Sequence, residues 1–399
     1  MSVFDVAVIG AGAAGMMCAA VAGQRGKRVV LLDHAEKLAE KIRISGGGRC
    51  NFTNRVVKAE HFISANPHFC KSALAGFTPQ DFIDLVDRHG IAWHEKHKGQ
   101  LFCDQSSEQI IDLLRNECVD AGVQWMMPCA VSEVKRTDSP HTQEFVLQTD
   151  QGIVKCHSLV IATGGLAIPQ LGATDFGLKL AREFGLKIIE PRPALVPLTF
   201  NGEQWRPLVD LAGLALQAVV STGSGRHAPA FMEDVLFTHK GLSGPGILQI
   251  SSYWQPGEPI ALDLAPDSDM EALLIEAKAG GRQQLGNLLA NFWPKRLSEQ
   301  WLGELATSRI ADLPDRTLRE LAARIKGWSV VPNGTLGYKK AEVMRGGVDT
   351  RELDQRTMQA KAVPGLYFIG EVVDVTGWLG GYNFQWAWAS GVACGRGLV

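Results

Sequence analysis

The feature that most constrains this chain is a glycine-rich turn between two apolar segments near its N-terminus. Residues 4–9 form an apolar run, Gly10-Ala11-Gly12-Ala13-Ala14-Gly15 follows, and a second apolar run at residues 28–32 ends at Asp33. A strand, a glycine turn, a helix, a second strand and an acidic residue in this order are typical of a βαβ unit that binds the ADP part of a dinucleotide.

Each position of this motif has a physical role. Gly10 permits the tight turn, Gly12 lets the backbone approach a pyrophosphate, and Gly15 lets the helix pack closely on the strand. The helix N-terminus offers unpaired N–H groups and the positive end of its dipole to the phosphates. Asp33 lies 18 residues beyond Gly15, where its carboxylate can accept hydrogen bonds from a ribose diol. We therefore predict a dinucleotide site at this end of the chain.

A signal peptide or a membrane-spanning helix is the alternative interpretation, because residues 6–23 contain no charged side chain. However, no basic segment precedes them, Asp5 adjoins them, and their glycines and alanines make them only weakly apolar. We expect a buried strand and a close-packed helix, in a cytoplasmic protein with no membrane span.

The composition is that of a globular protein without a polyanionic partner. The 399 residues are enough for two or three domains, 46% are hydrophobic, and the formal net charge is -2. No nucleic-acid partner is therefore expected, and the short basic cluster at residues 94–98 is interpreted as solvated surface. The eight cysteines include no CxxC pair and no Cys/His group at zinc spacing, which predicts reduced thiols and no metal site.

A second glycine-rich segment covers residues 41–51, in which Ser45 and Arg49 flank three consecutive glycines. Three glycines in a row do not suit the interior of a helix or a strand. We interpret the segment as a loop whose backbone approaches a ligand closely, with a flexible surface loop as the alternative.

The segments between these motifs predict a mixture of helices and strands. Residues 78–125 are charged and carry a helical apolar stripe, so we interpret them as helical. Short strands are expected at 130–136 and 144–149, and a buried strand at 157–165 runs into another glycine turn. That turn lacks the GxGxxG pattern and no acidic residue ends a strand about 20 residues later, so we predict one dinucleotide-binding fold and not two.

The middle of the chain predicts a small β-rich insert followed by helices. Helical periodicity extends over residues 269–328. The segments with strand character, several of them joined by Gly/Pro turns, are 195–200, 214–222, 234–237, 259–264, 329–332 and 341–348.

The C-terminal segment carries a second strong signal. An apolar run at residues 365–369 ends at Gly370 and Glu371, and Gly380-Gly381 stands immediately before a predicted helix. A helix N-terminus behind two glycines presents its N–H groups to an electron-rich group. In a flavin enzyme that group is the N1–C2=O edge, which gains negative charge on reduction. The alternative is a helix that only packs, with its tryptophans in the core.

Three segments together resemble the BaiN/RdsA-like NAD(P)/FAD-dependent oxidoreductases, and the resemblance covers essentially the whole chain. They are residues 44–51 (ISGGGRCN), 237–245 (FTHKGLSGP) and 370–383 (GEVVDV through GGYN). The resemblance implies an α/β fold with a discontinuous Rossmann-type FAD-binding domain, a β-barrel-like insert and a small helical subdomain. The implied boundaries are 1–190 and 335–399 for the FAD-binding domain, 191–267 for the insert, and 268–334 for the helical subdomain, with a return to the insert at its end.

The resemblance also implies which residues hold FAD. At the adenosine end they are Gly10, Gly12, Ala14 and Gly15 for the pyrophosphate, Asp33 for the ribose, Val131 for the adenine through its backbone, and Thr163 and Gly164 over the nucleotide. On the flavin side they are Lys41, Gly46, Gly47, Gly48, Gly370, Glu371, Asn383 and Phe384. The sequence departs from similar chains in having Asp33 where Glu is more usual and Met344 where Thr is frequent.

We predict an FAD-dependent oxidoreductase that transfers hydride through flavin N5, as an NAD(P)H-linked reductase of a small organic substrate. NAD(P)H would bind transiently, since there is no second nucleotide fingerprint. The substrate-side candidates are Arg49, Cys50 and His239, although Cys50 can equally be a packing residue and His239 a structural one. The alternatives are an O2-using oxidase of a small amine or aminoketone, a flavin-bound RNA-modifying protein, and a non-catalytic redox sensor.

Overall fold

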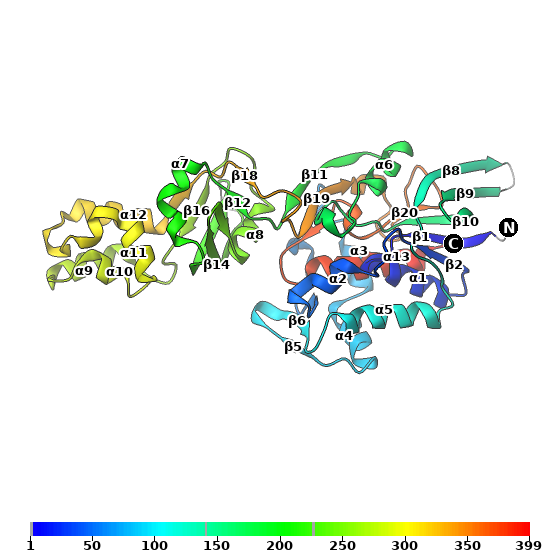
Figure 1. Cartoon of the computed structure of the whole chain (residues 1–399), viewed down its shortest axis with the longest axis horizontal. Helices are drawn as coiled ribbons and strands as arrows, with labels where there is room; N and C mark the ends of the chain where they lie inside the picture. Colours follow the sequence, from blue (N-terminus) through cyan, green and yellow to red (C-terminus); the bar gives the residue numbers. More distant parts are fainter. Residues whose placement is uncertain (1–2, 140–141, 226–227) are drawn as a thin grey trace. The chain divides into compact units, whose positions relative to one another are not determined.

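The computed structural model describes residues 3–139, 142–225 and 228–399, and it divides the chain into two compact units. The first unit consists of Met1–Arg192 and Val343–Val399, and the second consists of Pro193–Glu342. The first unit is therefore discontinuous in sequence. Figure 1 shows this by colour, because the blue N-terminal elements share one unit with the red C-terminal helix.

A seven-stranded sheet forms the centre of the first unit. Its main path runs β7 (Gln124–Met126), β2 (Val29–Leu32), β1 (Phe4–Ile9), β10 (Gly152–Ile161), β9 (Thr142–Thr149) and β8 (Val131–Ser139), and β20 (Leu366–Phe368) also pairs with β10. The strands from β7 to β10, together with β20, are parallel. The registers place Leu32, Ile9, Ile161 and Phe368 at one level, at the carboxyl ends of these strands. Strand order reverses at β1, which is where open parallel sheets bind their ligands.

Two helices with small residues pack closely beside this sheet. α1 (Ala13–Gln24) begins directly after the first glycine turn, and α13 (Tyr382–Gly397) lies against it (Figure 1). A Cβ added at Gly391 would lie 2.7 Å from the Ala14 carbonyl oxygen, and one added at Gly395 would lie 2.8 Å from the Cβ of Val21. These glycines are what allow the two helix backbones to approach. Within the described ranges, no helix combines the length and the apolar character that crossing a membrane requires.

The interpretation of residues 78–125 as helical is wrong for its middle part. The segment contains α4 (Pro79–Arg88), β5 (Trp93–Glu95), β6 (Gln100–Cys103) and α5 (Glu108–Asp120). β5 and β6 form a hairpin that joins β3 (Asn51–Asn54) in a three-stranded antiparallel sheet, in the order β3-β6-β5. Strands of three or four residues are too short to show a period of two, and their pairing with β3 depends on a segment distant in sequence.

Smaller elements complete the first unit. They are α2 (Glu40–Ile44), β4 (Phe62–Ile63), α3 (Lys71–Gly76), α6 (Phe176–Glu183), β19 (Val343–Val348), which pairs with β11 (Ile188–Ala194), and β21 (Thr376–Gly377), which pairs with β4.

The second unit combines an antiparallel sheet with a group of helices. Its sheet runs β17 (Trp328–Val330), β16 (Ile260–Asp263), β13 (Ala215–Thr222), β14 (Ala230–Thr238), β15 (Gly241–Ser243), β12 (Leu198–Thr199) and β18 (Gly334–Thr335). Its helices are α7 (Gly202–Trp205), α8 (Pro245–Ser251), α9 (Met270–Ala279), α10 (Leu285–Leu289), α11 (Lys295–Leu302) and α12 (Asp315–Lys326). The buried ring of Phe237 stacks between Trp205 and Trp328, at 6.0 and 6.2 Å between centroids. The predicted fold class, a Rossmann-type α/β domain with a β-rich insert and helices, is confirmed.

Candidate functional site

The glycines of the first glycine turn have two different roles, since two of them allow close packing and one leaves the backbone exposed. Gly10 has φ +109°, and a Cβ there would lie 2.7 Å from the carbonyl carbon of Ala162, while a Cβ at Gly15 would collide with the carbonyl of Gly10. These two glycines are required by the fold itself. By contrast, a Cβ at Gly12 would meet nothing within 4 Å, and no side chain caps α1 there. The turn therefore presents open backbone at a helix N-terminus, which is the form of a phosphate cradle.

Asp33 is bound directly to this turn. The backbone N–H of Ala11 donates to Asp33 Oδ2 at 2.7 Å, and the N–H of Ala35 donates to Oδ1 at 2.9 Å. The carboxylate therefore stands beside the glycine turn at the end of β2, and each oxygen keeps a further lone pair for a ligand. Val131, which the resemblance places at adenine, is half-buried at the start of β8, and nearby the N–H of Cys129 donates to the Asp33 carbonyl at 2.6 Å.

The turn after β10 contains a buried hydroxyl that lacks a partner. Among the residues that the structure describes, Thr163 Oγ1 is a buried side-chain oxygen with no hydrogen bond. The next residue, Gly164, has φ +72° and open space where a Cβ would lie. This hydroxyl faces Gly177 in α6, since a Cβ on Gly177 would collide with Thr163 Oγ1. The open backbone at Gly164 is the part of this turn that fits a bound dinucleotide.

The loop after α2 is a defined turn. Gly46, Gly47 and Gly48 have φ of +58°, +66° and +82°, and the carbonyl of Ser45 accepts hydrogen bonds from the N–H groups of Gly48 and Cys50, both at 3.0 Å. A Cβ would meet nothing within 4 Å at Gly47 or at Gly48. The loop thus offers a second stretch of exposed backbone.

Lys41 and Glu371 bring the two ends of the chain together. Lys41 Nζ lies 3.0 Å from Glu371 Oε2, and the backbone N–H of Met344 donates to Glu371 Oε1 at 2.8 Å. A Cβ on Gly165 would lie 2.6 Å from the same Oε1. Position 344 therefore contributes its backbone to this cluster, while the Met344 side chain is buried.

The segment before α13 is held by its own side chains. Asn383 Oδ1 accepts from the N–H of Gly377 at 2.8 Å, and Asn383 Nδ2 donates to the carbonyl of Gly377 at 2.9 Å. The Phe384 ring stacks on Trp388 at 5.6 Å between centroids. Gly370, with φ +70°, approaches the first glycine turn, because a Cβ there would lie 2.9 Å from the Cβ of Ala14. These contacts place the C-terminal segment beside the N-terminal one.

The three substrate-side candidates lie in different surroundings. Arg49 is exposed, whereas Cys50 is completely buried and its burial raises the pKa of the thiol far above its ordinary value. A buried, protonated thiol favours the packing role for Cys50. His239 is exposed in the second unit, in the turn between β14 and β15.

One group of side chains beside the C-terminal loop was missed by sequence reasoning. The ring of His61 packs against Trp378 and Tyr382, at 4.7 and 4.8 Å between centroids. The N–H of Lys58 donates to His61 Nδ1 at 3.2 Å, so the neutral ring carries its proton on Nε2. Burial lowers the pKa of His61 below its ordinary value of 6.5. No spacing motif marks these residues, because pairing of β4 with β21 is what joins them.

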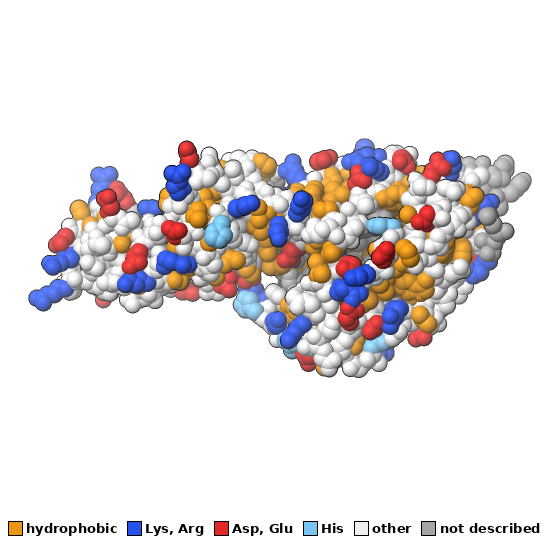
Figure 2. Space-filling view, viewed as in Figure 1, with side chains coloured by type: hydrophobic (Ala, Val, Ile, Leu, Met, Phe, Trp, Pro, Cys, Tyr) orange, Lys and Arg blue, Asp and Glu red, His pale blue; other side chains and the backbone are white. Residues whose placement is uncertain are grey.

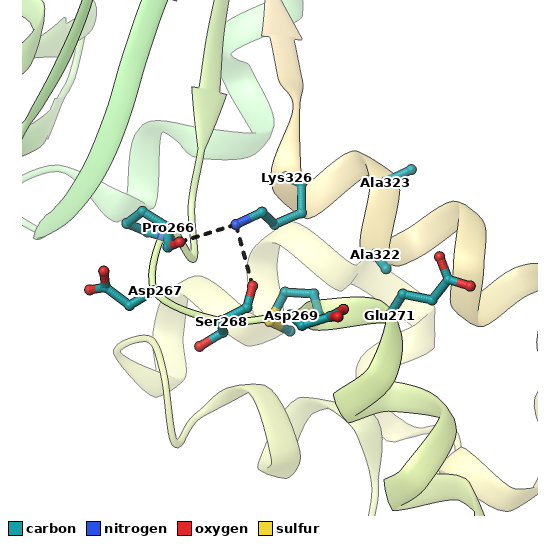
Figure 3. Close-up of a pocket in the computed structure, with 9 residues that line it drawn as sticks. Pro266, Asp267, Ser268, Asp269, Glu271, Ala322, Ala323 and Lys326 are labelled. Carbon is teal, nitrogen blue, oxygen red and sulfur yellow. Dashed lines mark hydrogen bonds between the residues drawn. The ribbon is translucent and has the colours of Figure 1, made fainter.

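A separate cavity of about 570 Å³ lies in the second unit (Figure 3). Lys326 is one of the residues that line this cavity. Its ammonium group donates to the carbonyls of Ala265 and Ser268 at 2.9 and 3.3 Å and pairs with Asp263 at 2.7 Å. The lysine is thereby committed to holding the chain between β16 and α9. In the described part of the chain, no group of three or more His, Cys, Asp or Glu residues could hold a metal ion.

The sequence of this chain is similar to those of several known proteins. Residues 4–397 match the family model described as "HI0933-like protein Rossmann domain". The chain is 52% identical over 402 residues to the "Ribosomal RNA dihydrouridine synthase" of Escherichia coli (strain K12), covering 100% of this chain and 99% of that one. It is 46% identical over 390 residues to the protein of the same name from Haemophilus influenzae, covering 97% and 96%. It is 29% identical over 415 residues to the "3-dehydro-bile acid delta(4,6)-reductase" of Clostridium scindens, covering 98% of each chain.

Proposed function

Because this chain belongs to the HI0933-like family and is an FAD-dependent oxidoreductase, we propose that it reduces uracil bases of ribosomal RNA to dihydrouracil. The observation that carries the proposal is the 52% identity to a relative named for this activity, over the full length of both chains. The flavin-bound RNA-modifying alternative is thus favoured over a small organic substrate. The expectation of no nucleic-acid partner rested on a net charge of -2, which averages over the surface and leaves room for a local basic surface.

The residues of the first unit fit FAD. The exposed backbone at Gly12 and Gly164 suits the pyrophosphate and the nucleotide, and Asp33 suits the ribose. Gly47 and Gly48, with the Lys41–Glu371 pair and the segment from Gly370 to Phe384, would hold the flavin side. When bound and reduced by NAD(P)H, the flavin would supply the hydride.

The proposed reaction adds two electrons and two protons across the C5–C6 bond of uracil. The C4 carbonyl makes C6 electrophilic, so the hydride forms the new C6–H bond, the C5=C6 π-bond breaks, and C5 takes a proton from an acid. NAD(P)H is oxidised to NAD(P)+ for each base reduced.

The test uses ribosomal RNA from a strain that lacks this gene. The purified FAD-loaded chain and NADPH or NADH are added, and the nucleosides are analysed by mass spectrometry. We expect dihydrouridine to form at the expense of the pyridine nucleotide. Absence of dihydrouridine, although the flavin is reduced and reoxidised normally, would overturn the proposal. The 29% identity to a bile acid reductase supports a second candidate, reduction of a conjugated steroid-type enone, which is assayed in parallel.

A further inference from the structure

The C-terminal end of α13 lines a small cavity of the first unit. The cavity has a volume of about 250 Å³ and lies between the last turns of α13, the helix α3 and the segment that contains Arg356. Its polar lining consists of Arg356, Arg396 and Ser72, and the rest is Gly, Ala and Val. Among the described residues, none that lines this cavity is acidic. We call the cavity the arginine pocket.

The polar side chains of the arginine pocket keep hydrogen-bond donors for a ligand. Arg396 Nη1 donates to the carbonyl of Gly76 at 2.9 Å, which uses one of the five N–H donors of a guanidinium group. In the described part of the chain, neither the Arg356 guanidinium nor the Ser72 hydroxyl has a hydrogen bond or an ion pair. Both arginines are exposed to solvent. The pocket therefore offers N–H and O–H donors and no competing acceptor side chain in its wall.

The loop that carries Arg356 is fixed against the end of α13. A Cβ on Gly397 would lie 2.8 Å from the Cβ of Thr357, so the two backbones are in close contact. Asp354 Oδ1 accepts hydrogen bonds from the N–H groups of Arg356 and Thr357, both at 2.9 Å. The Asp354 carboxylate is therefore bound to the backbone of its own loop, and it holds that loop in the conformation that brings Arg356 to the pocket.

The donors of the arginine pocket match a phosphate group. A guanidinium group is planar and presents paired N–H donors whose spacing fits two oxygens of one phosphate. On the face drawn in Figure 2, Lys and Arg side chains alternate with Asp and Glu side chains, and the described residues form no continuous basic surface there. Contacts from this unit to a nucleic acid are therefore expected at individual sites, where arginines converge on one cavity.

We infer that the arginine pocket binds a phosphate group of the RNA substrate. The inference rests on the proposed function and adds a contact outside the reacting base. α13 has 16 residues, and it is about 24 Å long at about 1.5 Å per residue. The pocket lies at the end of α13 opposite to Gly380-Gly381, the segment proposed to lie at the flavin, so the bound phosphate belongs to a nucleotide other than the target. Contacts to phosphates fix the position of a nucleic acid without reading its sequence.

The test compares Arg356→Gln/Arg396→Gln with the control Arg28→Gln/Arg115→Gln, both as FAD-loaded full-length chains. The control removes the same charge from the same unit, at two exposed arginines that pair with aspartates outside the pocket. Binding of heat-denatured ribosomal RNA is measured across a salt series. Loss of one phosphate contact should weaken binding and lower the slope of log affinity against log salt by about 0.7. Arg356→Gln alone should act in the same direction without loss of FAD or stability, because its guanidinium has no partner to lose.

Affinity and slope equal to the control's would overturn the inference, as would failure of the unaltered chain to bind RNA. If the unaltered chain binds RNA without forming dihydrouridine, the proposed reaction fails, whereas weaker binding in the Arg356/Arg396 variant would still support the pocket. Inorganic phosphate is also titrated, with thermal unfolding as the readout. If phosphate stabilises the unaltered chain and not the pocket variant, while the RNA affinities of variant and control are equal, the pocket holds a free anion and the assignment to RNA is wrong.

Discussion

The ion pair between Lys41 and Glu371 joins a residue of the N-terminal part of the first unit to a residue of its C-terminal part. Both side chains are partly exposed, at 32% and 19%, so the pair itself contributes little to folding. We predict that Lys41→Met weakens FAD binding by about 10- to 150-fold, because a charged hydrogen-bond donor is worth about 1.5–3 kcal/mol. Free energy of unfolding of the apoprotein should change by less than about 1 kcal/mol.

Flavin fluorescence titration of the apoprotein measures this affinity. The matched control is Lys37→Met, because Lys37 is an exposed lysine a few residues away. Equal FAD affinity in the two variants would exclude Lys41 from the cofactor site.

His61 makes stability depend on pH. Burial is the main cause that lowers its pKa below 6.5, with Lys58 acting in the same direction and Glu60 against both. The unfolded chain therefore binds a proton that the folded chain does not, so folding is favoured above the unfolded pKa and is weakened as pH falls below it. We predict that His61→Gln flattens the loss of stability between about pH 7 and about pH 5.

Urea unfolding at a series of pH values measures this effect, as the difference in the free energy of unfolding between the variant and the unaltered chain. His239→Gln is the control, because His239 is exposed. A difference that stays constant with pH would mean that His61 does not titrate as its burial indicates.

At the scale of elements, the N-terminus of α13 depends on one close approach. Gly381 has φ +93°, and a Cβ there would lie 2.8 Å from the Cα of Thr53 and still closer to its carbonyl. We predict that Gly381→Ala destabilises the protein by more than about 1 kcal/mol and reduces bound FAD, because α13 and β3 must separate. Thermal unfolding and flavin content measure the two effects.

Gly122→Ala is the matched control for this prediction. Gly122 also has a left-handed backbone, with φ +71°, but a Cβ there would meet nothing within 4 Å. The Gly122→Ala variant should therefore lose stability only through the strain of a left-handed backbone at an alanine. If Gly381→Ala and Gly122→Ala lowered the free energy of unfolding equally, the close contact between α13 and β3 would not contribute to stability.

The elements that sequence reasoning predicted are those with strong local signals. β1, α1 and α13 follow apolar runs and glycines whose positive φ or close packing leaves few other residues possible, as at Gly10 and Gly381. β5 and β6 were missed, because their strand character comes from pairing with β3 and not from their own short sequences.

The candidate site divides in the same way. The glycines and Asp33 could be proposed from spacing, whereas the contact of His61 with Trp378 requires the pairing of β4 with β21. The role of Met344 was also out of reach, since it contributes a backbone N–H to Glu371 and no side-chain signal. Contacts between distant segments carry no local pattern, and they are what the structure adds.

At the scale of the whole molecule, the chain leaves the first unit after Arg192 and returns at Val343. Every residue proposed to hold FAD lies in that first unit, either before or after the second unit in the sequence. The cofactor would therefore bind segments that are separated by the entire second unit in sequence. FAD bound in this way would link the segment before the second unit to the segment after it.

This arrangement predicts how loss of FAD changes stability. A ligand that binds only the folded state stabilises it by about 2.7 kcal/mol when its free concentration is about 100 times Kd. Removing FAD should lower the free energy of unfolding of the first unit by that amount, and adding FAD back should restore it. Hydrogen exchange locates the effect. Protection should fall at residues 10–15, 46–48, 163–165 and 370–384, while β13 and β14 of the second unit should keep theirs. An equal loss of protection in both units would mean that the cofactor stabilises the chain globally and does not act through these four segments.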